Sequence, residues 1–560
     1  MAKSYGTMNE AHSALPSSAS TATIGGSSVG ARSTSPTLAA VHKKHHRHES
    51  NDGERHSSDE SPLLNNGPHH NQDIGHGNEV GPSAGFWSCT INLANTILGT
   101  GMLAMPGALA TVGLLLGSFM IVFSACASGL GLYFLTRSAS KTHGRSASFF
   151  ACSKLTYPSA AVWFDLAIAI KCFGVGISYL IIIGDLMPGV VRSLGMMAFI
   201  AAGGDGAGEM DPQLWFLVDR RFWITLFMGI IGPLSFLKKL DSLKATSALA
   251  LSAVFYLVFI VLYYFVNPTQ PMPPKEEIRL VHFSSQLLTT LPIFVFAFTC
   301  HQNIFSVYNE LTDNGQSMLN RIISSSIGSA VVVYHIIGVL GYLTFGNNVG
   351  SNIIQMYNDS LLVTVGRIAI VVLVMFSFPL QCHPCRACLD KVLIAVGQFW
   401  DSTRFSKKSR EYNSIRAGAD SIQHAGDDSS ENSTILPPHT PSSVTLAAQS
   451  QDEDDEDDID HGDHGGAEIP EFKFMIMTMA ILIGSYIIAI TVTELELVLS
   501  FVGSTGSTAI SFILPGSFYY KLHANQPWTG RKILAVLLAF YGCMVMVICL
   551  SANIRRIINS

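Results

Sequence analysis

The sequence has few charged residues for its length. Of its 560 residues, 13% are charged and 48% are hydrophobic, whereas a soluble protein usually carries about 25% charged residues. The charge that is present is concentrated in two hydrophilic regions outside the long apolar segments. This composition excludes an ordinary soluble globular chain and predicts an all-α polytopic membrane protein with hydrophilic tails, for which the lipid bilayer is the main partner.

The sequence also lacks a disulfide pattern, a secretory leader and a catalytic motif. Its ten cysteines are scattered and mostly lie in apolar segments, unlike a secreted disulfide framework. No charged region followed by a short apolar core stands at the start, so the first span is expected to direct insertion. The one dense cysteine run, 382–388, has CxxCxxC spacing but no second ligand pair for zinc. We therefore expect no enzyme, cofactor, metal site or nucleic-acid partner.

The apolar stretch 85–115 is long enough to cross a bilayer, but its middle disfavours a continuous helix. There Gly99, Thr100 and Gly101 place two glycines around a small polar residue. A helix interrupted in hydrocarbon leaves N–H and C=O groups unpaired, which is tolerated where they line a cavity or bind a ligand. The second half-helix would then offer the positive end of its dipole to an anion. The alternative is a glycine-rich face that packs against another helix.

A second apolar stretch, 287–311, carries a polar cluster in its middle. Thr299, Cys300, His301 and the two amides that follow stand at membrane depth, and polar clusters there are costly and usually functional. Two interrupted helices in corresponding halves of a chain are the best pointer to an inverted repeat with its binding site at the interface. The two breaks therefore predict a transporter built from spans one to five and six to ten, with an eleventh span added.

The apolar segments predict eleven membrane helices in three groups. Spans one to five occupy 85–265, spans six to eight 266–399, and spans nine to eleven 471–560. Residues 1–84 and the acidic linker 400–470 lack apolar periodicity and are expected to be disordered. The expected spans are 85–115, 115–135, 161–187, 222–237, 245–265, 286–311, 322–345, 361–382, 472–490, 496–519 and 533–551.

Loop charges and short motifs predict orientation and sorting. Lys and Arg are concentrated in the loops after spans two, four, eight and ten, which places the N-terminus in the cytosol. Asn358 begins an Asn-Asp-Ser sequence in a lumenal loop and is a candidate glycosylation site. In the N-terminal tail, Asp59 precedes the pair Leu63 and Leu64, which resembles an acidic dileucine signal that a sorting adaptor would read. It would send the protein to a vacuole or lysosome.

Six long motifs resemble the amino acid/auxin permease family. The likeness is greatest to fungal vacuolar amino acid transporters and weaker to animal sodium-coupled neutral amino acid transporters, and it covers all expected spans but not the tails. It implies a LeuT-like fold and proton- or sodium-linked movement of amino acids. The motifs that carry it are 91–106, 173–188, 234–247, 298–311, 378–387 and 503–516.

The resemblance also implies roles for individual residues. The amides of Gly99, Thr100 and Gly101 would hold the substrate α-carboxylate, and the carbonyls of the second break, 299–302, would take the α-ammonium. Cys300 and His301 would shape the side-chain pocket. Other family positions fall on Asn95 and Ser377, which would form a cation site. Alternatively, Asn95 only caps the first half-helix and Ser377 only bonds its own backbone.

Three ionisable residues at membrane depth are candidates for coupling to an ion. Lys171 lies in the third span, Asp185 near its lumenal end and His301 in the sixth. A buried lysine can occupy the place of a sodium ion and exchange a proton, and histidine titrates near neutral pH. The alternatives are that Lys171 is paired for structural reasons and that His301 only hydrogen-bonds the gap in its helix.

Taken together, these features predict a secondary active transporter that moves amino acids across a vacuolar or lysosome-like membrane by alternating access. Coupling to protons is favoured, with a sodium-coupled symporter as one alternative. A plasma-membrane location is the alternative for the site of action. An amino-acid sensor that signals through its cytosolic tails is a further alternative, motivated by the length of those tails.

Overall fold

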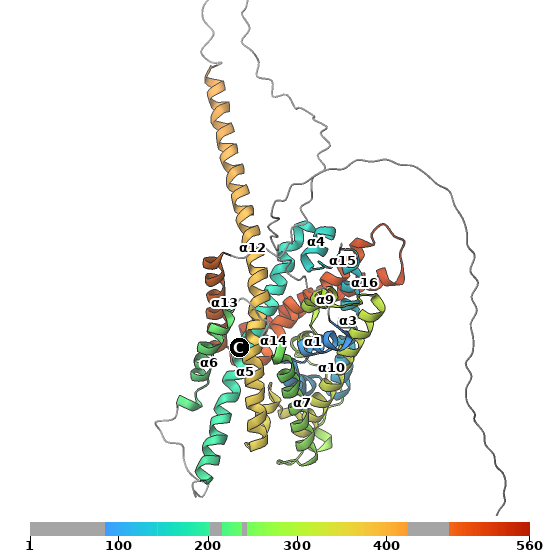
Figure 1. Cartoon of the computed structure of the whole chain (residues 1–560), viewed down its shortest axis with the longest axis vertical. Helices are drawn as coiled ribbons and strands as arrows, with labels where there is room; N and C mark the ends of the chain where they lie inside the picture. The colour runs from blue at the N-terminus through green and yellow to red at the C-terminus, as the bar shows by residue number, and fades with distance from the viewer. Residues whose placement is uncertain (1–83, 143, 202–215, 238–243, 424–469, 560) are drawn as a thin grey trace, which may run out of the picture. The chain divides into compact units, whose positions relative to one another are not determined.

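The computed structural model describes residues 84–142, 144–201, 216–237, 244–423 and 470–559 (Figure 1). The predicted sorting signal Asp59, Leu63 and Leu64 lies outside these residues. In the described part the chain is helical, and its extended backbone forms a single isolated bridge, between Ala84 and Leu311.

Nine helical segments of the described chain are long and apolar enough to cross a membrane, and a bent pair brings the number to ten. This confirms the predicted all-α membrane protein. α6 (Arg220–Ser235), the expected fourth span, has only 16 residues, fewer than the roughly 20 that a span requires. The unbroken long helices are α3 (Leu114–Ala139), α5 (Ala161–Ala201), α7 (Lys244–Val266), α10 (Gln316–Phe345), α12 (Leu361–Gln423), α13 (Glu471–Thr491) and α16 (Gly530–Asn559).

Both predicted interruptions are present. In the first, α1 (Phe86–Ile97) and α2 (Gly101–Val112) meet at an angle of 52°. In the second, α8 (Leu287–Ala297) ends before a short turn, and α9 (Ile304–Glu310) resumes after it. Helix formation therefore fails where small or polar residues replace apolar ones, as the sequence predicts.

A third irregular span was not predicted. Between α14 (Leu495–Val502) and α15 (Leu514–Leu522) the backbone forms two π-helical turns, Gly503–Ser507 and Ala509–Ile513. A Cβ atom on Gly503 would lie 2.0 Å from the carbonyl oxygen of Pro292, so only glycine allows this span to pack so closely on α8. π-Helical turns interrupt the regular ladder of hydrogen bonds and are frequent at functional sites.

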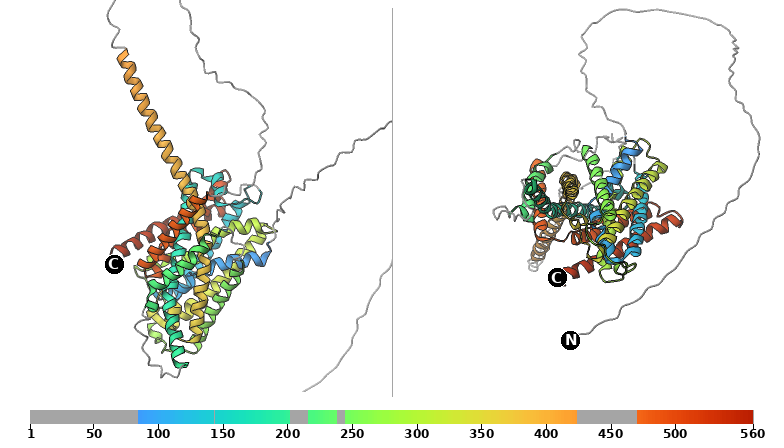
Figure 2. Two further views of the ribbon diagram at one scale, coloured as in Figure 1. Left: turned by 60° about the vertical axis from the view of Figure 1, so that its left-hand side comes forward. Right: turned by 90° about the horizontal axis from the view of Figure 1, so that it is seen from below.

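Two helices are longer than the sequence predicts. The third span was expected to end at residue 187, but α5 continues to Ala201 with Pro188 inside it. Proline is tolerated in membrane helices because neighbouring groups satisfy the freed carbonyl. α12 continues to Gln423 and extends away from the other helices (Figures 1 and 2). The expected linker therefore begins with helix, because residues 401–423 contain no proline to end it.

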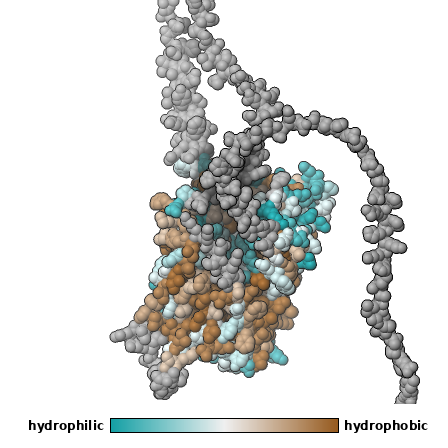
Figure 3. All heavy atoms as spheres, in the orientation of Figure 1, coloured by the Kyte–Doolittle hydropathy of each residue, from teal (hydrophilic) through white to brown (hydrophobic). Residues whose placement is uncertain are grey.

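The surface of the helical part agrees with a membrane environment. Figure 3 shows apolar side chains over most of the described surface on this face, with hydrophilic ones gathered near the top right. Large apolar side chains such as Phe255, Phe540 and Val547 are 63–66% exposed, which in water would be a costly patch. Inside, α5 packs against α12 along much of its length, and these two helices form one wall of the site described next.

Candidate functional site

The two helix breaks lie against each other, although about 200 residues separate them in the sequence. A Cβ atom on Gly101, the first residue of α2, would lie 3.0 Å from Cα of Ala297, the last residue of α8. The buried Tyr334 hydroxyl of α10 lies 2.6 Å from the carbonyl oxygen of Ile97 and 2.9 Å from that of Ala297. One hydroxyl thus satisfies the last carbonyl of α1 and the last carbonyl of α8, the two half-helices that precede the breaks.

The opposite side of the first break presents the N-terminus of α2. Thr100 is its N-cap residue and makes no side-chain cap, and the first N–H groups of a helix have no partner within it. Two tight backbone bonds, Met102 N to Gly99 O and Leu103 N to Thr100 O, both 3.2 Å, shape the turn. The break therefore points a positive dipole end at whatever lies beside it.

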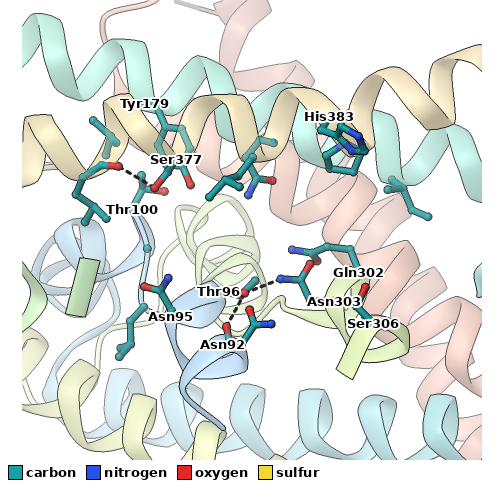
Figure 4. Close-up of a pocket in the computed structure, with 18 of the residues that line it drawn as sticks. Asn92, Asn95, Thr96, Thr100, Tyr179, Gln302, Asn303, Ser306, Ser377 and His383 are labelled. Carbon is teal, nitrogen blue, oxygen red and sulfur yellow. Dashed lines mark hydrogen bonds between the residues drawn. The ribbon is translucent and has the colours of Figure 1, made fainter. Parts of the chain in front are cut away.

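A cavity of about 990 Å³ lies at this break. It runs from Gly99 and Thr100 between α1, α5, α9 and α12 to the end of the bundle that carries the short helix α4 (Phe149–Thr156) (Figure 4). The wall near the breaks includes Tyr179 and Ser377, which Figure 4 draws side by side. An amino acid occupies far less space than this, so the cavity also provides a path to the outside.

Amide side chains form part of the polar lining of the cavity. Asn303 Nδ2 donates to Thr96 Oγ1 at 2.7 Å, and Thr96 Oγ1 donates to the backbone oxygen of Asn92 at 2.9 Å. This chain ties the second break to α1 (Figure 4). The five amide residues of the lining are Asn92, Asn95, Gln302, Asn303 and Gln381.

Charged residues of the lining stand only at its outer end. They are Asp165, Glu310 and Lys391, and Lys391 Nζ lies 3.9 Å from Asp165 Oδ1. Near the breaks, the lining formed by described residues has no Asp, Glu, Lys or Arg. The inner cavity therefore favours a ligand without net charge, because a charged group there would lose water without gaining an opposite charge.

Four residues predicted for the site line the cavity: Gly99, Thr100, Asn95 and Ser377. The Ser377 hydroxyl donates to the backbone oxygen of Leu373 at 2.8 Å, which agrees with the alternative interpretation of that residue. Gly101 does not belong to the lining, because it packs against α8.

Thr299, Cys300 and His301, which the sequence predicts for the pocket, lie next to the second break. All three are buried but outside the cavity lining. His301 Nδ1 lies 3.0 Å from Ser511 Oγ, and Nε2 lies 3.1 Å from the backbone oxygen of Ser128. Since a carbonyl only accepts, Nε2 carries a proton, and the Ser511 hydroxyl lies within hydrogen-bond distance of both Nδ1 and Thr299 Oγ1. These side chains fasten the second break to α3 and to the π-helical turns.

The two remaining charged candidates lie outside the cavity lining as well. Asp185 was expected near a helix end, but it lies within the longer α5 and pairs with Arg220 at 2.9 Å. Lys171 is 4% exposed, and its Nζ lies 3.4 Å from Oε1 of Gln381. Because Gln381 lines the cavity, Lys171 is one side chain away from the ligand space.

A smaller polar cavity of about 260 Å³ lies at the far end of α2. Gly107 and Thr111 of α2 line it together with Arg279, His282 and Glu496. The apolar, buried residues Ala104, Met105 and Pro106 separate it from the large cavity along α2. The helix break thus lies between a wide opening on one side and a narrow polar recess on the other.

The candidate glycosylation residue, Asn358, is exposed in the segment before α12. Its Oδ1 accepts a hydrogen bond from Gln270 Nε2 at 2.9 Å. The side chain is thus accessible on the protein surface.

Sequence reasoning did not identify Thr96 or Tyr179 as cavity residues, and it assigned a role to the carbonyl of Gln302 but not to its side chain. Gln302 was part of the predicted polar cluster, but side-chain direction follows from helical periodicity, and the periodicity is lost at the break. Thr96 and Tyr179 lie in otherwise regular helices, where nothing in the local sequence distinguishes a cavity face from a packing face.

Interrupted membrane helices that meet at a polar cavity are typical of secondary transporters. Comparison with known proteins agrees with this class: residues 82–555 match the family described as transmembrane amino acid transporter protein. The chain belongs to this family, and it is an amino acid transporter rather than an enzyme.

Individual relatives are similar over most of the chain. It is 40% identical over 486 residues to "Vacuolar amino acid transporter 5" of Schizosaccharomyces pombe, which covers 85% of this chain and 95% of the relative. It is 38% identical to the protein of the same name from Saccharomyces cerevisiae, over 83% of this chain and 97% of the relative. Identity to rat "Solute carrier family 38 member 10" is 23%, over 81% of this chain and 35% of that protein.

Proposed function

We propose that this protein is a proton-linked secondary transporter that moves amino acids across a vacuolar membrane by alternating access. Two spans supplement the nine long segments found by length and composition: the bent α1–α2 pair counts as the first, and short α6 as the fourth. Spans one to five and six to ten then form an inverted repeat, with α16 as the eleventh. The cavity at the two breaks is the single observation that carries this proposal.

The shape of the site supports alternating access. The large cavity leads to the end of the bundle that carries Arg145, Lys154 and Lys391, and the positive-inside rule assigns such an end to the cytosol. The structure then corresponds to a cytosol-open state. The recess around Arg279 and Glu496 is the closed lumenal path, and opening it requires α2 to separate from its neighbours.

Substrate binding divides between the two breaks. The α-carboxylate binds at the N-terminus of α2, beside Gly99, Thr100 and Gly101, because free N–H groups and the dipole favour an anion there. The α-ammonium binds between the Asn95 amide oxygen and a carbonyl oxygen of the second break. Four carbonyls near that break already accept a hydrogen bond, those of Ala297, Phe298, Cys300 and His301, which leaves the carbonyl of Thr299 for the ligand.

Lys171 is the best-supported proton carrier. Both ring nitrogens of His301 are hydrogen-bonded inside the bundle, and none of its neighbours in these bonds lines the cavity. Asp185 is held by Arg220. Lys171 is buried in the wall, its hydrogen-bond partner is the cavity residue Gln381, and no carboxylate among the described residues pairs with it within 4.0 Å. A group placed in this way can exchange a proton when the cavity wall moves.

A vacuolar location is supported by the relatives and by the acidic dileucine pattern at Asp59, Leu63 and Leu64. Tagged full-length protein should label the vacuolar membrane, and replacing Leu63 and Leu64 by Ala should move it elsewhere. Unchanged vacuolar labelling of that variant would assign sorting to another segment.

Uptake of labelled amino acids into proteoliposomes tests the proposed function. We expect flux with a pH gradient and no sodium, and none with sodium alone. Flux that requires sodium would instead make Asn95 and Ser377 an occupied cation site. Binding without flux for all twenty amino acids would favour a sensor.

Replacing Lys171 by Met tests the proton carrier. We expect proton-driven uptake to fall to the level of protein-free liposomes, while exchange of amino acid for amino acid persists, because exchange needs no net proton movement. Lys391→Met is the matched control, since Lys391 stands at the outer mouth and is half exposed. Proton-driven uptake that survives in Lys171→Met would assign coupling to another group.

A further inference from the structure

One cavity residue has an amide group without a partner. The Nε2 and Oε1 atoms of Gln302 are both buried, and neither has a hydrogen-bond partner among the described residues. Its neighbour Asn303 differs, because the Asn303 amide donates to Thr96. Buried polar groups are nearly always paired, so each exception requires an explanation, and at a binding cavity the missing partner is a ligand.

Gln302 is placed where a ligand can reach it. It belongs to the turn His301–Asn303 between the two halves of the second interrupted helix, and it lines the large cavity. Figure 4 shows its side chain next to that of Asn303, directed into the space between α1 and α12. The residue reaches the cavity while its amide atoms are buried, so a side-chain rotation would present them to a bound molecule.

The chemistry of this amide selects its partner. Oε1 accepts and Nε2 donates, side by side in one plane. A ligand carboxamide satisfies both atoms with two parallel hydrogen bonds, whereas an apolar side chain satisfies neither. Acidic and basic side chains are excluded for a different reason, since the lining near the breaks has no charged residue among those described.

We propose that Gln302 is a specificity residue that pairs with the side-chain carboxamide of the substrate, so that glutamine and asparagine are the preferred cargo. The inference rests on the proposed amino-acid transport through this cavity. The α-carboxylate is held at the first break, around Thr100. The side chain then extends toward the second break, where Gln302 is found. A site built around hydrogen bonds to a substrate rejects analogues that lack them far more strongly than it rejects a change of size.

Shape-matched substrates test the proposal. Glutamine and methionine have similar length, as have asparagine and leucine. In proteoliposomes, the wild-type protein should transport glutamine with a kcat/KM at least about tenfold above that of methionine, with the same order for asparagine and leucine. Gln302→Met keeps the length of the side chain and removes its amide. This variant should lower the glutamine-to-methionine ratio about tenfold or more, mainly through slower glutamine transport.

Gln270→Met is the matched control, because Gln270 is exposed and its amide donates to Asn358, outside the cavity lining. It should leave both ratios within about twofold of wild type. An equal loss of all substrates in Gln302→Met would overturn the proposal, since Gln302 would then bind the part common to all amino acids. A wild-type protein that moves amino acids without preferring carboxamides would overturn it too, even if the variant failed to fold. Absence of flux for every amino acid would contradict the proposed function instead.

Discussion

The breaks of the two interrupted helices lie against each other, but they contribute polar groups to the cavity in different ways. At the first break, Thr100 and the amides of α1 face the cavity. At the second break the polar residues divide: Thr299, Cys300 and His301 turn away, whereas Gln302 and Asn303 face the cavity. The residue types are similar in both places, so composition alone does not distinguish a group that binds a ligand from one that anchors a helix.

The difference arises from what each break packs against. The first lies beside the open space between α5 and α12, so its polar groups stay available. The second lies against α3 and the π-helical turns, where Ser128 and Ser511 satisfy His301. The second break therefore has a fixed half and a free half, and substitutions in the two halves should have different consequences.

The largest effect is expected at the first break. Replacing Thr100 by Trp fills the cavity at the N-terminus of α2 and should reduce uptake to the level of protein-free liposomes, with normal amounts of protein in the membrane. Val122→Trp is the control, because Val122 is 45% exposed on the outer side of α3 and should tolerate a large side chain. Normal transport by the Thr100 variant would show that the substrate does not bind at the first break.

An intermediate effect is expected where the two breaks are joined. Tyr334→Phe removes the hydroxyl shared by the carbonyls of Ile97 and Ala297, and leaving buried polar groups unpaired costs about 1–3 kcal/mol. We expect a lower melting temperature and a higher KM for amino acids.

Tyr342→Phe separates these two effects. Tyr342 is also buried in α10, but its hydroxyl donates to Asn347 at 3.2 Å, away from the breaks. This variant should lose stability without a change in KM. Equal KM values in the two variants would contradict a role for Tyr334 in shaping the site.

The smallest effect on transport is expected at the fixed half of the second break. Ser511→Ala removes the partner of His301 Nδ1 and should destabilise the protein by about 1–3 kcal/mol, visible in thermal unfolding of the detergent-solubilised protein. Because these residues lie outside the cavity lining, KM should remain at the wild-type value. A raised KM with unchanged stability would contradict this, and it would indicate that His301 helps to bind the substrate.

The sequence was sufficient for the broad architecture. Apolar length located the spans, and the residues Gly99, Thr100 and Gly101 together with the polar cluster after Phe298 located both breaks. These signals are local, since a run of apolar residues or a pair of glycines acts on its own segment. The length of α5 was not predictable. Pro188 predicts the end of a helix, and only knowledge of the neighbouring groups that accommodate it shows that the helix continues.

The division of the second break was not predictable either. Whether His301 or Gln302 faces the cavity depends on the φ and ψ angles of the interrupted backbone and on Ser511, which is about 210 residues away. The π-helical turn that carries Ser511 packs against α16 and α3. Distant partners of this kind leave no pattern within a single segment of sequence.

The central claim is that the cavity at the two breaks binds amino acids from the cytosolic side. It is tested most directly by labelling a single cysteine there, Asn92→Cys, in a protein whose ten native cysteines are replaced by Ser. A membrane-impermeant maleimide applied to the cytosolic face should label this cysteine, and a transported amino acid should slow the reaction at concentrations near its KM. Labelling that no amino acid slows, even at saturation, would contradict the claim.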